Sequence, residues 1–149
     1  MASYDSPTMA GHSATGFQDL LLLLGRILLG VLFAQSGFGK LFNIAGFAGG
    51  LEGLPFPYVL AAIGAIVEFF GGLAIIFGAW TRLAALALVV FTLAATLIAH
   101  RYWDMPADAQ PMQRIQFMKN LAIIGGLLAF AGVGGGRYGV DGLRTRRGR

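Results

Sequence analysis

The sequence contains no cysteine and only two histidines. Without cysteine, the 149-residue chain can form no disulfide, catalytic thiol, thiolate metal site or cysteine-ligated iron–sulfur cluster of its own. One histidine and one glutamate near the predicted bundle are too few ligands for a transition metal, and haem would lack a second axial histidine. Phosphate loops, nucleophile triads and dinucleotide fingerprints are also missing. We therefore expect no metal and no intrinsic cofactor, so that any redox role depends on a bound quinone or on a partner.

Charge is scarce as well, and long apolar segments take its place. Charged residues make up 12% of the chain, about half the share in a soluble domain, and hydrophobic residues make up 56%. Four apolar segments approach the roughly 20 residues of a membrane-spanning helix, and none has the polar outer face of a soluble helix. They lie at about residues 20–38, 58–80, 83–100 and 117–135. The predicted fold is all-α, a transmembrane four-helix bundle with a short second connection and longer first and third loops.

This bundle, residues 19–136, follows a polar segment at 1–18, predicted to be flexible, and precedes a basic tail at 137–149. The polar segment lacks the basic region of a secretory signal, so the first span is expected to be retained. With four spans, both termini lie on one side. Six basic residues on that side against four in the other two loops favour cytoplasmic termini. The tail is expected to face anionic lipid, and no nucleic-acid partner is expected.

Glu68 is the only charged residue in the second span, and this makes it the first functional candidate. A carboxylate within hydrocarbon is costly and is normally turned inward and paired. At about 1.5 Å per residue, Arg26 lies roughly 21 Å below Lys40, and Glu68 lies roughly 16 Å below Pro57. If both loop residues lie at the outer interface, Arg26 and Glu68 are at nearly one level. We predict that they pair, either as the base of a functional site or as a structural bridge between helices.

Further polar residues are expected at the outer mouth of the same bundle. Helical spacing places Lys40 on the face of Arg26, and His100 on a face with two threonines, Thr92 and Thr96. The predicted result is a polar funnel whose rim also carries Lys119 and Asn120. The alternative is that His100 is an interfacial residue and that the lysines are snorkelling anchors. The threonines are expected to bond to carbonyls of their own helix.

Several motifs together resemble the DoxX-like family of small four-helix membrane proteins. They are Arg26-x3-Gly30-x2-Phe33, Ser36-Gly37-x2-Lys40-Leu41, Gly53-Leu54-Pro55, Glu68-x2-Gly71-Gly72, Gly78 with Arg82, His100-x2-Trp103 and Phe117-x-Lys119-Asn120-Leu121-x3-Gly125-Gly126. The similarity extends from Arg26 to Gly136. It implies a multi-pass protein of the bacterial inner membrane, often associated with quinone-linked oxidation of sulfur compounds or with oxidative-stress assemblies. Since the chain has no cysteine, direct sulfur transfer by its own residues is not expected.

The leading hypothesis is an auxiliary subunit of a quinone-linked redox system, which binds quinone or a small substrate or relays protons. In this hypothesis Arg26 and Glu68 form the polar base of the site and Phe33 and Trp103 its apolar walls. His100, Lys119 and Asn120 bind a ring carbonyl or an anionic group. A redox-enzyme partner and a homo-oligomer are both compatible with it. The alternative is a non-catalytic membrane scaffold or a small-solute permease.

Overall fold

The computed structural model describes the backbone of residues 10–147 and the side chains of residues 16–144, and the regular secondary structure of this part consists of helices joined by turns and loops. Its elements are α1 (Ala10–Leu41), α2 (Ile44–Gly49), α3 (Pro57–Phe77), α4 (Thr81–Ala99), the 3-10 turn η1 (Tyr102–Asp104), α5 (Gln110–Val133) and α6 (Val140–Arg147). Within the described residues, α1 from Gly16 onward and three later helices are long and apolar enough to cross a membrane. The predicted all-α four-helix membrane bundle is confirmed.

Two helices are longer than their apolar segments. α1 begins at Ala10, so a helix occupies the later half of the predicted flexible segment 1–18, whose first nine residues lie outside the described part. α5 begins at Gln110, seven residues before the predicted span, with Pro111 in its first turn. Proline suits that position because its missing N–H has no intrahelical partner there. Hydropathy detects only the part of a helix that is apolar, so polar helical ends are missed.

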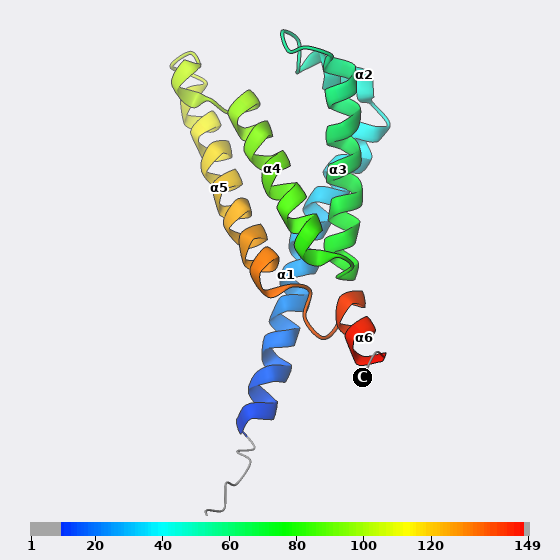
Figure 1. Cartoon of the computed structure of the whole chain (residues 1–149). Coiled ribbons are helices and arrows are strands. Elements are labelled where there is room, and N and C mark those ends of the chain that lie inside the picture. The colour runs from blue at the N-terminus through cyan, green and yellow to red at the C-terminus, as the bar shows by residue number, and fades with distance from the viewer. Residues whose placement is uncertain (1–9, 148–149) are drawn as a thin grey trace, which may run out of the picture.

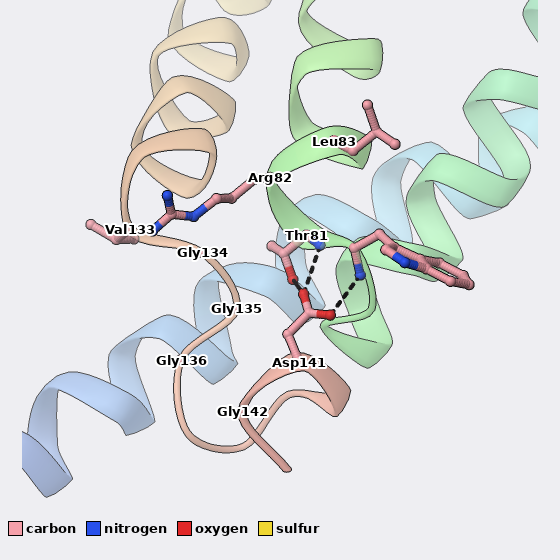
Figure 2. A pocket seen from close by; sticks show the side chains of 10 residues that line it. Thr81, Arg82, Leu83, Val133, Gly134, Gly135, Gly136, Asp141 and Gly142 are labelled. Carbon is pink, nitrogen blue, oxygen red and sulfur yellow. Dashed lines mark hydrogen bonds between the residues drawn. The ribbon is translucent and has the colours of Figure 1, made fainter. Parts of the chain in front are cut away.

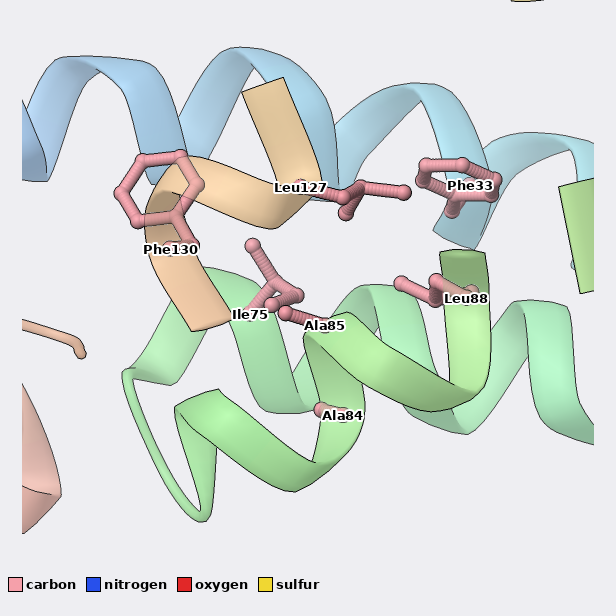
Figure 3. Close-up of a cluster of buried hydrophobic side chains, with 7 residues drawn as sticks. All are labelled: Phe33, Ile75, Ala84, Ala85, Leu88, Leu127 and Phe130. Carbon is pink, nitrogen blue, oxygen red and sulfur yellow. The ribbon is translucent and has the colours of Figure 1, made fainter. Parts of the chain in front are cut away.

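The pair formed by α1 and α3 meets the pair formed by α4 and α5 at one end of the bundle, and the two pairs diverge toward the other end (Figure 1). We call the converging end the hairpin end, because the tight turn at Gly78–Trp80 joins α3 to α4 there. The opposite, loop end carries α2 and η1. A cluster of buried apolar side chains from all four helices lies toward the hairpin end (Figure 3), with Ile75, Leu88 and Leu127 fully buried. The buried apolar core of the bundle therefore lies nearer the hairpin end than the loop end.

Glycines set the register of α1 against α3. A Cβ at Gly72 would lie 2.5 Å from the backbone nitrogen of Ala34, and one at Gly37 would collide with the backbone of Phe69. Such close approach requires small residues, as in other membrane helix pairs. The contacts of Gly72 with Ala34 and of Gly37 with Phe69 fix which residues of the two antiparallel helices lie side by side. Lys40 consequently lies beside Glu68.

The predicted basic tail contains a short helix, α6, which packs beneath the hairpin end (Figure 1). The Asp141 N–H donates to the carbonyl of Gly78 at 2.9 Å, and the Arg137 N–H donates to the Asp19 carboxylate at 2.9 Å. Side chains beyond Arg144, including the last arginines of the tail, lie outside the described residues. The described part of the tail is thus docked on the bundle, which the sequence did not predict.

Candidate functional site

The buried carboxylate of Glu68 pairs with Lys40, not with Arg26. The Lys40 Nζ of α1 donates to the Glu68 Oε2 of α3 at 2.5 Å. The Glu68 side chain is only 6% exposed and that of Lys40 is 27% exposed. The predicted Arg26–Glu68 contact is therefore wrong, although the prediction that Glu68 faces inward and pairs with a cation is correct.

The error comes from the assumption that Lys40 and Pro57 lie at the same height. The register places Lys40 beside Glu68, which is eleven residues or roughly 16 Å along α3 from Pro57. Lys40 is consequently inside the bundle, and Arg26 is displaced by a similar distance to the hairpin end. There the Arg26 Nη2 donates to the Tyr138 carbonyl at 3.2 Å.

Two aromatic rings complete the surroundings of Lys40. Its Nζ lies 4.7 Å from the ring centre of Phe47 in α2 and 5.5 Å from that of Phe91 in α4. Both distances allow cation–π attraction, which is stronger away from water. Gly64 provides the space, because a Cβ there would lie 3.2 Å from the Phe91 ring and 3.4 Å from the Phe47 ring. Sequence reasoning missed both rings because no local pattern links α2 or α4 to Lys40.

A cavity of about 320 Å³ lies beside the ion pair and reaches toward the loop end. We call it the polar cavity. Phe33, one of the apolar residues predicted for the site, forms part of its wall. Its polar lining comes from all four long helices and the residue after α4: Ser36, Lys40, Glu68, Thr92, His100, Gln116, Lys119 and Asn120.

Most of the predicted site residues therefore meet at this cavity, and two do not. Arg26 lies at the hairpin end. Trp103 is half exposed and packs edge-on against Tyr102 and Phe117 at ring-centre distances of 5.1 and 5.7 Å. It belongs to an aromatic cluster beside the α4–α5 connection and does not line the cavity. Lys40 and Gln116 line it, although Lys40 was expected only at the rim and Gln116 was not considered.

Hydrogen bonds orient several of these groups. The hydroxyls of Thr92 and Thr96 donate to the carbonyls of Leu88 and Thr92, at 2.7 and 2.6 Å, which confirms the prediction for both threonines. Asn120 Nδ2 donates one of its two N–H groups to the Thr96 Oγ1 at 2.9 Å, so the second N–H can donate to a ligand. His100 Nδ1 lies 2.8 Å from Gln113 Oε1.

Lys119, which is exposed, makes no hydrogen bond or ion pair within the described part of the chain. The cavity therefore offers one paired cation, one unpaired cation and two amide groups to a ligand. Oxygen atoms with partial or full negative charge suit this set. Among the described residues no group of three or more His, Asp or Glu could hold a metal ion.

A second polar cluster, at the hairpin end, fastens the C-terminal segment. The Asp141 carboxylate accepts hydrogen bonds from the N–H groups of Trp80 and Thr81 at 2.9 Å, and from the Thr81 hydroxyl at 3.0 Å (Figure 2). The N-cap residue of α4 itself, Trp80, makes no side-chain cap. Asp141 thus caps α4 from α6, at the positive end of the helix dipole. The adjoining pocket of about 440 Å³ is lined mainly by glycine backbone and by residues already used for this cap.

Partial burial acts to raise the pKa of the Asp141 carboxyl, but the hydrogen bonds from Thr81 and Trp80 and the charge of Arg144 outweigh it. The pKa is therefore held below its ordinary value. A carboxyl whose pKa is lowered on folding stabilises the fold above its unfolded pKa of about 3.9, and this contribution is lost as the pH falls through the folded pKa.

Asp141→Ala is expected to lower the unfolding free energy at neutral pH by about 1 kcal/mol, the usual effect of losing a helix cap. The difference from the unsubstituted protein should shrink as the pH falls below about 4. Thermal unfolding in detergent at several pH values measures it. Asp104→Ala is the control, because within the described residues the Asp104 carboxylate makes a single, exposed ion pair, with Arg101. Equal effects of both substitutions at neutral pH would contradict the capping role.

The fold and the polar cavity define a class, that of multi-pass membrane proteins with a polar site inside a four-helix bundle. A family model described as DoxX matches residues 21–101. The chain is 36% identical over 130 residues to the inner membrane protein YqjF of Escherichia coli (strain K12), covering 87% of this chain and 96% of the relative. It is 35% identical over 129 residues to the inner membrane protein YphA of the same organism, covering 83% and 90%. The chain belongs to the DoxX family. It matches no solved structure.

Proposed function

We propose that this protein is an auxiliary subunit of a quinone-linked redox system of the bacterial inner membrane, with the polar cavity as the site for a quinone head group. The observation that carries this proposal is the Lys40–Glu68 pair, a buried ion pair that borders a cavity instead of being packed on all sides. Ionisable groups at such a depth are costly and are commonly retained where they act on a ligand or on protons. The names of the two relatives support the inner-membrane location.

The residues around the cavity suit both forms of a quinone. Lys119 and the Asn120 amide can donate hydrogen bonds to ring carbonyls, and the Glu68 carboxylate can accept one from a quinol hydroxyl. Phe33 offers an apolar wall to the ring. Reduction of a quinone takes up two electrons and two protons. The chain holds no cysteine and no group of three or more metal ligands among its described residues, so a partner subunit or soluble enzyme is proposed to supply the electrons.

The termini are proposed to face the cytoplasm, because the basic residues are biased to that side. The hairpin end would then lie at the cytoplasmic surface. The polar cavity would lie toward the periplasmic half of the membrane, so electrons and protons would enter the site from a periplasmic partner or from within the membrane.

A non-catalytic scaffold or a small-solute permease remains the second candidate. One observation favours the scaffold, because the Lys40–Glu68 ion pair bridges α1 and α3 directly and a buried pair can serve only to fix helix register. In that case the cavity holds no specific ligand, and substitutions along its wall affect stability alone.

The proposal predicts that a chain-free dimethoxybenzoquinone raises the melting temperature of the purified protein in detergent, since a ligand that binds only the folded state stabilises it. Lys119→Met and Asn120→Leu should each raise its dissociation constant by about tenfold, the cost of one lost hydrogen bond to a polar ligand. Arg114→Met is the matched control, because Arg114 lies on α5 outside the cavity lining.

Thiosulfate, a sulfur-compound substrate probe, is titrated in the same assay. If neither the quinone nor thiosulfate shifts the melting curve, the cavity is not a site for these ligands and the scaffold function stands. If Lys119→Met, Asn120→Leu and Arg114→Met weaken binding equally, the quinone binds elsewhere.

A further inference from the structure

We infer that the ligand of the polar cavity is an amphiphile with one flexible apolar chain, and that a second, apolar pocket of the bundle holds this chain. The inference rests on the proposed function, which it extends from a head group to a whole ligand. The second pocket has a volume of about 340 Å³ and lies between α2 with its following loop, α3 and α4. We call it the lateral pocket.

The lining of the lateral pocket excludes a polar ligand. It consists of twelve residues, all of them glycine, alanine, leucine, isoleucine or phenylalanine. A polar head placed there would lose its hydrogen bonds to water without replacement. An alkyl or isoprenoid chain loses nothing, and it gains contacts with the side chains of the wall.

The two cavities adjoin. Phe91 and Ala95 of α4 line both of them. Phe47, which lines the lateral pocket, also has its ring 4.7 Å from the Lys40 Nζ. The rings of Phe47 and Phe91 therefore lie near the Lys40 cation and also line the lateral pocket. In this proposal the head of the ligand lies beside Lys40, and its chain extends past the Phe91 ring into the lateral pocket.

The lateral pocket is also accessible from the side of the bundle. Leu60, Ile63 and Ile98 line it and are 41%, 54% and 40% exposed. They belong to α3 and α4, which diverge from the hairpin turn toward the loop end (Figure 1). In a bilayer this opening faces hydrocarbon, so the ligand can enter from the membrane without crossing water. Each cavity alone is near the lower limit for small-molecule sites, about 300 Å³, whereas the two together match an apolar pocket with a few polar groups.

The test compares two quinones that share one ring, of which one carries a decyl chain and the other none. Their dissociation constants are measured by thermal shift in the same detergent, and the ratio of the two constants is compared between variants, so that partitioning of the chain into micelles cancels. Ala94→Leu and Ala95→Leu, made separately, narrow the lateral pocket. Ala87→Leu is the matched control, because Ala87 lies on the same helix with its side chain exposed and lines neither cavity.

We expect the unsubstituted protein and Ala87→Leu to prefer the decyl quinone equally. In Ala94→Leu or Ala95→Leu this preference should fall by about tenfold, since excluding about two methylene groups from an apolar site has that effect. In Ala94→Leu, whose residue does not line the polar cavity, the affinity for the chain-free quinone should be unchanged.

An unchanged preference in both pocket variants, or an equal fall in Ala87→Leu, would overturn the inference and assign the lateral pocket to lipid chains. The proposed function would survive that result as long as the chain-free quinone still binds. Failure of both quinones to bind overturns the proposed function together with the inference.

Discussion

Replacing Glu68 by glutamine is expected to lower the unfolding free energy by about 3–5 kcal/mol, because it leaves the Lys40 ammonium inside the bundle without its counter-ion. The Glu68 side chain is buried and accepts its hydrogen bond from Lys40 across the α1–α3 interface. An unpaired cation there either stays charged at a high desolvation cost or gives up its proton, and both reduce stability. Lys40→Met should have a similar effect, because it leaves the carboxylate unpaired.

A double-mutant cycle measures the coupling between the two residues by unfolding in detergent. Lys40→Met combined with Glu68→Gln should recover most of the loss, since no charge then remains unpaired. The control combines Glu68→Gln with Arg26→Met. Because Arg26 lies at the hairpin end, these two effects should add to within about 0.5 kcal/mol. Coupling of Glu68 to Arg26 in place of Lys40 would contradict the register of α1 and α3.

The number and type of the long helices could be predicted from the sequence because hydropathy is a local property. Each apolar segment is long enough to require a hydrogen-bonded helix in a bilayer, whatever its neighbours are. The helix ends were less predictable. The first seven residues of α5, Gln110–Gln116, are helical but mostly polar, with a proline at Pro111, and their composition does not distinguish them from a loop.

The pairing of helices was not predictable to the same degree, because it depends on the conformation of the first connection. α1 continues to Leu41, and the chain then forms α2, with Asn43 accepting a hydrogen bond from the Gly46 N–H at 3.0 Å. Lys40 thereby remains inside the bundle and pairs with Glu68. An estimate of height that starts from a loop residue fails when that residue is not at the interface.

Small residues spaced four apart in a membrane helix allow close packing, but they do not determine which helix packs there. Gly30 and Ala34 do approach α3 closely, at Gly72. Gly125 and Ala129 have the same spacing, yet a Cβ at Gly125 would meet nothing within 4 Å among the described residues. The spacing shows that a helix permits close approach, whereas the partner helix is determined by the whole bundle.

The sequence predicted which residues line the candidate site better than it predicted which of them are in contact. Polar residues in apolar helices must turn away from lipid, so residues such as Glu68 and Asn120 were expected to converge. Their convergence on one cavity follows from this rule. The two phenylalanine rings beside Lys40 follow from no such rule, since phenylalanine is stable facing either lipid or protein. The lateral pocket could not be predicted from the sequence either, because the apolar residues that line it are equally stable facing lipid.

The sequence of the docked C-terminal segment contains one weak indication that it has a specific contact. Asp141 is the only acidic residue among residues 137–149, which otherwise carry five arginines. A single carboxylate in a basic segment suggests a specific partner, and the structure supplies one in the start of α4. The burial of Arg26 depends on this segment, because the Tyr138 carbonyl accepts a hydrogen bond from the Arg26 guanidinium.

Gly78→Ala is expected to lower the unfolding free energy by about 2–5 kcal/mol and to release the C-terminal segment. Gly78 ends α3 with a φ of +65°, in the left-handed region, where a side chain costs roughly 1–2 kcal/mol. In addition, its Cβ would lie 2.6 Å from the Cα of Gly139 and would collide with the guanidinium of Arg26. Overpacking of this kind costs about 1–3 kcal/mol.

Gly53→Ala separates these two effects. Gly53 also has a positive φ, +93°, but a Cβ there would meet nothing within 4 Å, so this variant should show only the backbone cost. Unfolding in detergent measures both losses, and trypsin cleavage at the arginines after Gly136 reports whether the segment is docked. Cleavage should accelerate in Gly78→Ala and stay unchanged in Gly53→Ala. Equal losses of stability, with slow cleavage in both variants, would show that the C-terminal segment does not pack against Gly78 and that Arg26 is buried by some other contact.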